Sequence, residues 1–163
     1  MNDTNFVVIF LSALIPLAVG FVWYNPKIFG TTWMNACGLT EEKLQGGNMA
    51  LIFGLSFLFG IFIAFSLMPI VIHPFAIASA LGGYSMTEES AVVYNEVLTH
   101  IGGAHRSFGH GALHGGMTGI LFILPIIAIN AMFERKDFKY IAVNVGYWIV
   151  TLALMGGVIC QFV

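Results

Sequence analysis

Charged side chains are scarce in this sequence of 163 residues. Six Lys and Arg and eight Asp and Glu make up 9% of it, whereas soluble domains carry roughly a quarter. The net charge of −2 and the absence of a basic run exclude nucleic acid as a partner, because its recognition needs a basic surface. The sequence also lacks a phosphate-binding glycine loop, a nucleophile elbow and a cysteine pair at metal-binding spacing. It therefore favours a non-catalytic protein over an enzyme.

Long apolar stretches are abundant instead. Hydrophobic residues make up 58% of the chain and the mean hydropathy is +0.90. Backbone groups in lipid must bond within their own segment, so apolar stretches of roughly 20 residues are read as transmembrane helices. Four stretches qualify: 6–24, 49–72, 107–133 and 139–162. The sequence predicts an all-α integral membrane protein, with residues 1–163 forming a single transmembrane domain in the lipid bilayer.

Two connections between the spans are expected to be helical as well. Apolar residues recur at helical spacing from Ile28 to Cys37, which predicts a short cytoplasmic helix lying in the membrane interface. Trp23, Tyr24 and Trp33 are its expected interface anchors. These residues form a simple anchor or a docking surface for a partner.

The outer loop, residues 73–106, is long enough to hold an amphipathic helix between spans two and three. Thr87 precedes Glu88 and Glu89, and this order is typical of a helix start.

Proline and asparagine are the other features of the spans. Pro16 in the first span and Pro125 in the third are expected to kink their helices, because proline cannot donate a backbone hydrogen bond. Asn130 and Asn144 lie near the cytoplasmic ends of spans three and four. We expect their side chains to bond to each other across the short connecting turn.

The basic residues predict the orientation. Five of the six lie in two connections, and Arg106 alone lies in the loop 73–106. Excess Lys and Arg mark the cytoplasmic side. Both termini and the loop 73–106 are therefore expected outside, and the five residues inside are Lys27, Lys43, Arg135, Lys136 and Lys139.

Histidine is the residue type in this sequence that most often binds metals or cofactors. His110 and His114 are four residues apart on the third predicted span, and Glu96 and His100 are four apart on the predicted outer helix. Each pair shares one face of its helix. Together they would offer four ligands to a divalent metal such as zinc, copper or iron, and a histidine-ligated haem is a further possibility. Alternatively, these are ordinary helix-surface and hydrogen-bonding residues.

Small residues also recur every four positions, a spacing that lets helices approach closely in lipid. This pattern predicts helix packing, within the bundle or between subunits. The positions are Gly111, Gly115 and Gly119 in the third span, and Ser56, Gly60 and Ala64 in the second.

Several short strings resemble a family of small bacterial membrane proteins, domain of unknown function 1761. They are Trp23-Tyr24-Asn25-Pro26, Phe29-Gly30 with Trp33, Leu113-His114-Gly115, Asn130 to Arg135, Asn144 to Trp148 and Leu154-Met155-Gly156. The resemblance implies a four-helix membrane fold in the bacterial cytoplasmic (inner) membrane, and it implies no activity. The segment from His73 to Arg106 is longer than the loop usual in that family.

Three functional classes follow. The first is a non-catalytic subunit that forms a homo-oligomer or assists a membrane protein partner. The second binds a metal or cofactor through the outer histidines. The third is a small oligomeric transporter or channel, although no acidic residue lies within a span to couple proton or sodium transport.

Overall fold

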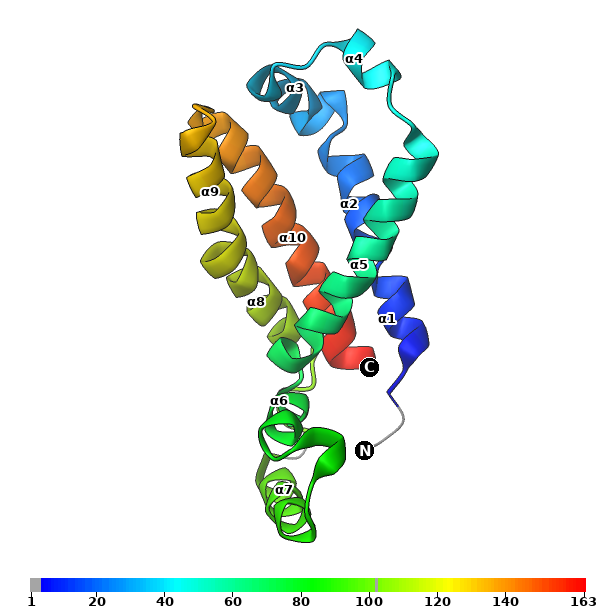
Figure 1. Cartoon of the computed structure of the whole chain (residues 1–163), viewed down its shortest axis with the longest axis vertical. Helices are drawn as coiled ribbons and strands as arrows, with labels where there is room; N and C mark the ends of the chain where they lie inside the picture. The colour runs from blue at the N-terminus through cyan, green and yellow to red at the C-terminus, as the bar shows by residue number, and fades with distance from the viewer. Residues whose placement is uncertain (1–3, 102) are drawn as a thin grey trace.

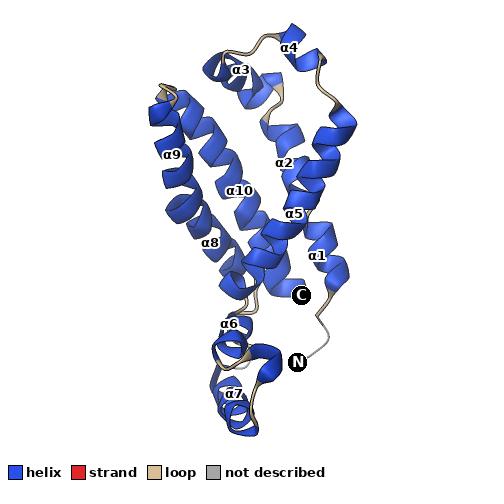
Figure 2. Ribbon diagram, viewed as in Figure 1, coloured by secondary structure: helices blue, strands red, loops and turns tan. Residues whose placement is uncertain are grey.

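The structure is a computed structural model that describes residues 4–101 and 103–163. Within these ranges the chain is built of helices and loops, without a strand (Figure 2). Four helical stretches are long and apolar enough to cross a membrane: Phe6–Trp23, Met49–Val71, Phe108–Phe133 and Phe138–Phe162. The predicted all-α fold with four transmembrane helices is therefore confirmed.

Two of the spans are single helices, and the other two are interrupted. The single helices are α5 (Met49–Val71) and α10 (Phe138–Phe162). The first span consists of α1 (Phe6–Ser12) and α2 (Ile15–Trp23). The third consists of α8 (Phe108–Thr118), a π-helical turn (Gly119–Ile123) and α9 (Leu124–Phe133).

Both interruptions have proline as their cause. Pro16 and Pro125 are each the second residue of the helix that follows the break. Neither proline can donate a backbone hydrogen bond to the carbonyl four residues earlier. The regular α-helical hydrogen bonding is therefore interrupted just before each proline. The kinks predicted at these two residues are confirmed as breaks in the α-helical hydrogen bonding.

Helix α10 lies at the centre of the bundle (Figure 1). Half of the residues in its most apolar stretch are buried inside the protein, compared with 11–22% in the other three spans. It contacts α1, α2, α5, α8 and α9, and its Met155, Ile159 and Cys160 form the core with Leu67 and Val71 of α5. The other spans therefore leave most of their apolar surface for lipid.

The contact between α8 and α10 is made by glycine. Gly111, Gly115 and Gly119 are all buried. A Cβ atom at Gly115 would overlap the backbone carbonyl of Leu152, and one at Gly111 would overlap that of Gly156. A Cβ at Gly119 would lie 2.8 Å from the Cα of Ile149. The glycine stripe of the third span thus packs within the chain, backbone against backbone.

The second small-residue stripe lies along α5. Gly60 faces the first span closely, because a Cβ there would lie 2.6 Å from the carbonyl oxygen of Ala13. Ala64 is fully buried and Ser56 is half-buried. Gly60 therefore marks the closest approach of this stripe to the first span.

Short helices lie at both ends of the bundle (Figure 1). A π-helical turn (Pro26–Gly30), α3 (Thr31–Cys37) and α4 (Glu41–Gln45) form one end, where α3 stops at Gly38 with φ 70°. At the other end α6 (His73–Ala80) and α7 (Glu88–Ile101) fill the connection between the second and third spans. Thr87 Oγ1 accepts from Ser90 N–H at 3.1 Å, as expected for the start of α7.

Candidate functional site

The expected interface anchors join the first span to α10. The indole Nε1–H of Trp23 donates to the carbonyl of Val143 at 3.1 Å, and the Tyr24 hydroxyl donates to Asn144 Oδ1 at 3.3 Å. The rings of Tyr24 and Trp33 lie 5.1 Å apart. Burial raises the pKa of Tyr24, so its hydroxyl stays a donor. These residues are structural connectors whether or not they also contact lipid headgroups.

Asn144 is paired differently from the sequence prediction. Its Oδ1 accepts from Tyr24 and its Nδ2–H donates to the carbonyl of Tyr140 at 2.8 Å. The predicted bond to Asn130 is therefore wrong. The reason is that α2 places a phenol beside Asn144, which no local spacing reveals.

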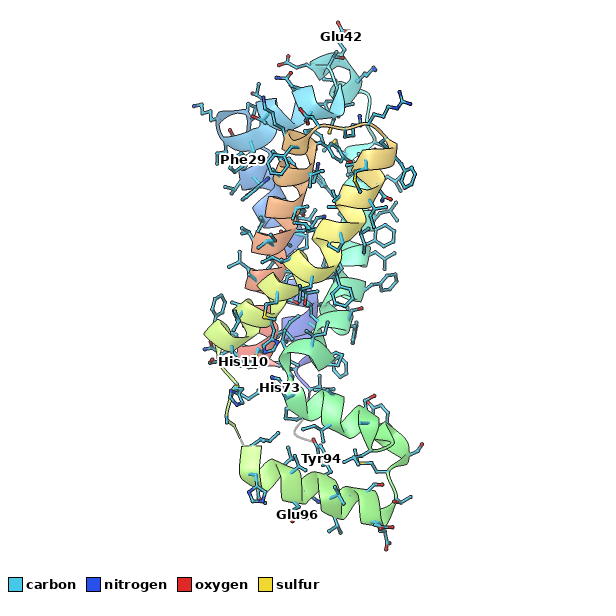
Figure 3. The ribbon with its side chains drawn as sticks, turned by 90° about the vertical axis from the view of Figure 1, so that its left-hand side faces the viewer. Phe29, Glu42, His73, Tyr94, Glu96 and His110 are labelled. Carbon is cyan, nitrogen blue, oxygen red and sulfur yellow. The ribbon has the colours of Figure 1, made fainter. Side chains whose placement is uncertain are left out.

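Three histidines gather at the opposite end of the bundle. His110 and His114 lie one turn apart on α8, and His73 is the first residue of α6. One ring nitrogen from each lies within 4.8 Å of the other two. Figure 3 shows His73 and His110 side by side where the spans end. We call His73, His110 and His114 the histidine group.

Local structure fixes the positions of these side chains. The Ser107 hydroxyl accepts from the backbone N–H of His110 at 3.3 Å and so begins α8 at this depth. Pro74 is the second residue of α6, a position that proline favours. His73 therefore lies two residues after the end of α5, at the end of the bundle where α8 begins.

The spacing of the group suits a small ion. His73 Nε2 and His110 Nε2 are 2.7 Å apart, a hydrogen-bond distance when one ring is the donor. Around a tetrahedral zinc ion with bonds of about 2.0–2.1 Å, ligand nitrogens lie ~3.3 Å apart. The ring nitrogens of the histidine group lie between 2.7 and 4.8 Å apart, and this range includes the value expected around zinc. Small ring rotations are enough to accommodate an ion.

The electrostatic setting favours the neutral form of His73. Burial, then the neighbouring His114 and His105, hold the pKa of His73 below its usual value of 6.5. Among the described residues, no carboxylate lies within the ligand group. At pH 7 His73 therefore presents an uncharged imidazole, the form that binds metal.

The structure does not bring the predicted quartet together. His110 and His114 belong to the group, whereas Glu96 and His100 do not. Both of the latter are exposed on α7, and Figure 3 shows Glu96 far from His110. The physical reason is that α6 separates α7 from the spans, so α7 contacts α6 rather than α8.

Sequence reasoning missed His73 as a member of the group. One signal was available: His73 follows the end of the second span and His110 lies at the start of the third. Consecutive spans run antiparallel, so residues at these two ends lie at the same depth in the membrane.

A separate cavity of about 600 Å³ lies beside the histidine group. Ile72 and Pro74, which flank His73, and Arg106 contribute to its wall, but the histidine rings do not. The cavity and the histidine group are therefore neighbouring features, not one site.

Comparison with known proteins gives one match. The family model described as "Protein of unknown function (DUF1761)" matches residues 7–160. No curated protein and no solved structure matches the chain. The match covers the histidine group, the glycine stripe and the aromatic residues of the first span.

Proposed function

The chain belongs to the family described as "Protein of unknown function (DUF1761)", and because that description assigns no activity, we propose from the geometry that this multi-pass membrane protein binds a transition-metal ion through His73, His110 and His114. The observation that carries the proposal is the approach of three imidazole nitrogens to within 4.8 Å. These nitrogens come from two separate helices, α6 and α8. His114 lies within the third span, where ionisable residues are rare and often functional.

The donor set restricts the ion. Three imidazoles and no carboxylate suit zinc, copper or iron and disfavour magnesium and calcium, which prefer oxygen ligands. Three protein ligands leave a fourth position open, as in sites that exchange or activate a ligand. A haem is less favoured, because the closely spaced rings of His73 and His110 leave no room for a macrocycle between them.

A hydrogen-bonded histidine pair is the competing explanation. It accounts for His73 and His110, which lie at hydrogen-bond distance. It leaves His114 unexplained, because no hydrogen bond found among the described residues uses its ring nitrogens. A single bound metal ion explains the positions of all three rings.

Zinc uptake tests this proposal. Tag-free protein in detergent, stripped with chelator and dialysed against Zn²⁺, is expected to take up about one ion per chain. Uptake at pH 7 should be complete and should fall as the pH drops below about 6.5, because protonated imidazole cannot ligate. The lowered pKa of His73 extends binding to lower pH than an unperturbed histidine would allow. Protein that takes up no zinc at pH 7 would refute the proposal.

The homo-oligomeric or accessory role has less support. Its supports are the glycine stripe, the interfacial helix and the absence of catalytic motifs, and the first is weakened because α10 covers the stripe within the chain. The role stays a prediction, as does an oligomeric transporter or channel. The metal proposal rests instead on a specific group of side chains.

We further propose that the histidine group faces outward across the bacterial cytoplasmic membrane, with both termini on that side. Five basic residues lie in the connections at the α3–α4 end and only Arg106 at the other. The Lys136 ammonium donates to the carbonyl of Cys37 at 3.3 Å, so the two basic connections lie together. Thr4 and Val163 line one cavity at the opposite end.

Reporter fusions test the orientation. Fusions at Lys43 and Lys136 are expected to report the cytoplasm, and a fusion at Glu89 the outside, because excess basic residues stay inside. A fusion at Glu134, in the same connection as Lys136, serves as a control. The opposite pattern would place the histidine group on the cytoplasmic side.

A further inference from the structure

A fourth imidazole lies beside the histidine group. The ring centre of His105 is 4.9 Å from that of His110 and 5.9 Å from that of His73. Ring centres within the group itself are 4.4–5.2 Å apart. His105 is exposed and lies in the connection between α7 and α8. Its ring is thus close to two of the three, His73 and His110, but carried by a loop.

The backbone of His105 is held in an unusual conformation. Its φ is 70°, in the left-handed region that residues other than glycine rarely adopt. Such strain persists only where the surroundings impose it, and it clusters at functional sites. An extended backbone at this residue would carry the ring along a different direction. The strain therefore points to a role for the position of this ring.

A buried thiol on α10 supplies the restraint. Cys160 is fully buried, and its Sγ lies 3.2 Å from the carbonyl oxygen of His105 and 3.1 Å from that of Val71. Val71 precedes His73 by two residues. The thiol has one proton to donate, so Cys160, on the central helix of the bundle, can bond to the carbonyl of either of the two segments that carry His73 and His105.

We propose that His105 is the fourth ligand of the ion and that Cys160 is a positioning residue, which holds the loop so that the imidazole can reach the ion. This inference rests on the proposed metal site and specifies its coordination as four imidazoles from α6, α8 and the preceding loop. A four-nitrogen shell closes the tetrahedron that three ligands leave open. Because His105 is the exposed ligand, it is also the one whose release lets the ion exchange with water.

The choice of variant matters for the test. His105→Asn removes the imidazole, and asparagine tolerates a left-handed backbone better than most residues do. The loop conformation is therefore kept while the ligand is lost. His100→Asn is the matched control, since His100 is an exposed histidine on α7 outside the group.

Cobalt is the probe, because its visible absorption reports the number and type of ligands. Chelator-stripped full-length protein in detergent is titrated with Co²⁺. The wild type and His100→Asn are expected to give the same intense bands of a four-coordinate site. His105→Asn should still bind one ion, with shifted bands as water replaces nitrogen. Its affinity should fall by at least about 10-fold, because even the loss of an outer-shell partner costs about 10–100-fold. Unchanged affinity and spectrum in His105→Asn would overturn the inference and leave the three-histidine site standing. A wild type that binds no Co²⁺ would instead remove the proposed function.

Cys160 variants test the positioning role. Cys160→Ala removes the donor and is expected to weaken Co²⁺ binding several-fold, with the bands shifted toward those of His105→Asn. Cys160→Ser keeps a hydrogen-bond donor of similar size and should restore most of the wild-type spectrum. Wild-type spectrum and affinity in Cys160→Ala would show that the thiol does not position His105.

Discussion

Replacing His73, His110 or His114 by alanine is expected to lower zinc affinity by more than 100-fold in each case. The loss of an outer-shell hydrogen bond alone costs about 10–100-fold, and each of these substitutions removes a ligand. The three variants should keep the helical content of the wild type, because none of the three side chains belongs to the buried core. Competition with a chelating dye measures the affinities.

His100→Ala supplies the control, because His100 is exposed on α7 and lies outside the group. It should bind zinc as the wild type does. The pair His73→Ala and His100→Ala separates two hypotheses. The spacing of residues predicted His100 as a ligand and left His73 out, whereas the structure places His73, and not His100, beside His110 and His114. Loss of zinc in His100→Ala with full binding in His73→Ala would contradict the site described here.

Gly115→Leu is expected to destabilise the bundle strongly. Even a Cβ at this position overlaps the backbone of Leu152, which cannot rotate away, so α8 and α10 must separate. Overpacking a close contact costs about 1–3 kcal/mol and occasionally more, and a branched side chain here should exceed that range. Thermal unfolding in detergent measures the effect.

Gly109→Leu is the matched control on the same helix. A Cβ at Gly109 meets nothing within 4 Å, so this variant should melt close to the wild type. Gly115→Leu should also weaken zinc binding, because it displaces the helix that carries His110 and His114. Equal melting temperatures for the two variants would mean that α8 does not pack against α10 through this stripe.

The spans were predictable because lipid leaves few alternatives. A backbone in hydrocarbon must be helical, so apolar length alone predicted four helices long enough to cross a membrane. Helix starts were readable where a polar side chain caps the backbone, as Thr87 does for α7. The proline breaks followed from the missing donor. These features depend on residues near one another in the sequence.

Contacts between distant segments were harder to predict. The glycine spacing predicted a close helix contact, but nothing local indicated that Leu152 and Gly156 of α10 are its partners. The bond from Tyr24 to Asn144 spans 120 residues. Each of these pairings depends on how the helices are arranged around α10, which hydropathy does not encode.

Two of the three residues of the histidine group were predicted from the sequence. His110 and His114 share a face of one helix, so their spacing identified them. His73 joins them only because α5 ends and α8 begins at the same depth, and Glu96 is excluded only because α6 holds α7 away. Both facts follow from the path of the connection between the second and third spans. That path is set by packing against the bundle end.

X-ray absorption at the zinc edge of the zinc-loaded wild type tests the metal site most directly. The histidine group predicts a first shell with at least three nitrogen atoms at about 2.0–2.1 Å, the outer-shell pattern of imidazole, and no sulfur at about 2.3 Å. A shell of oxygen atoms without imidazole scattering would mean that zinc binds elsewhere on the protein. In that case His73 and His110 would be a hydrogen-bonded pair, and the metal-binding function would be wrong.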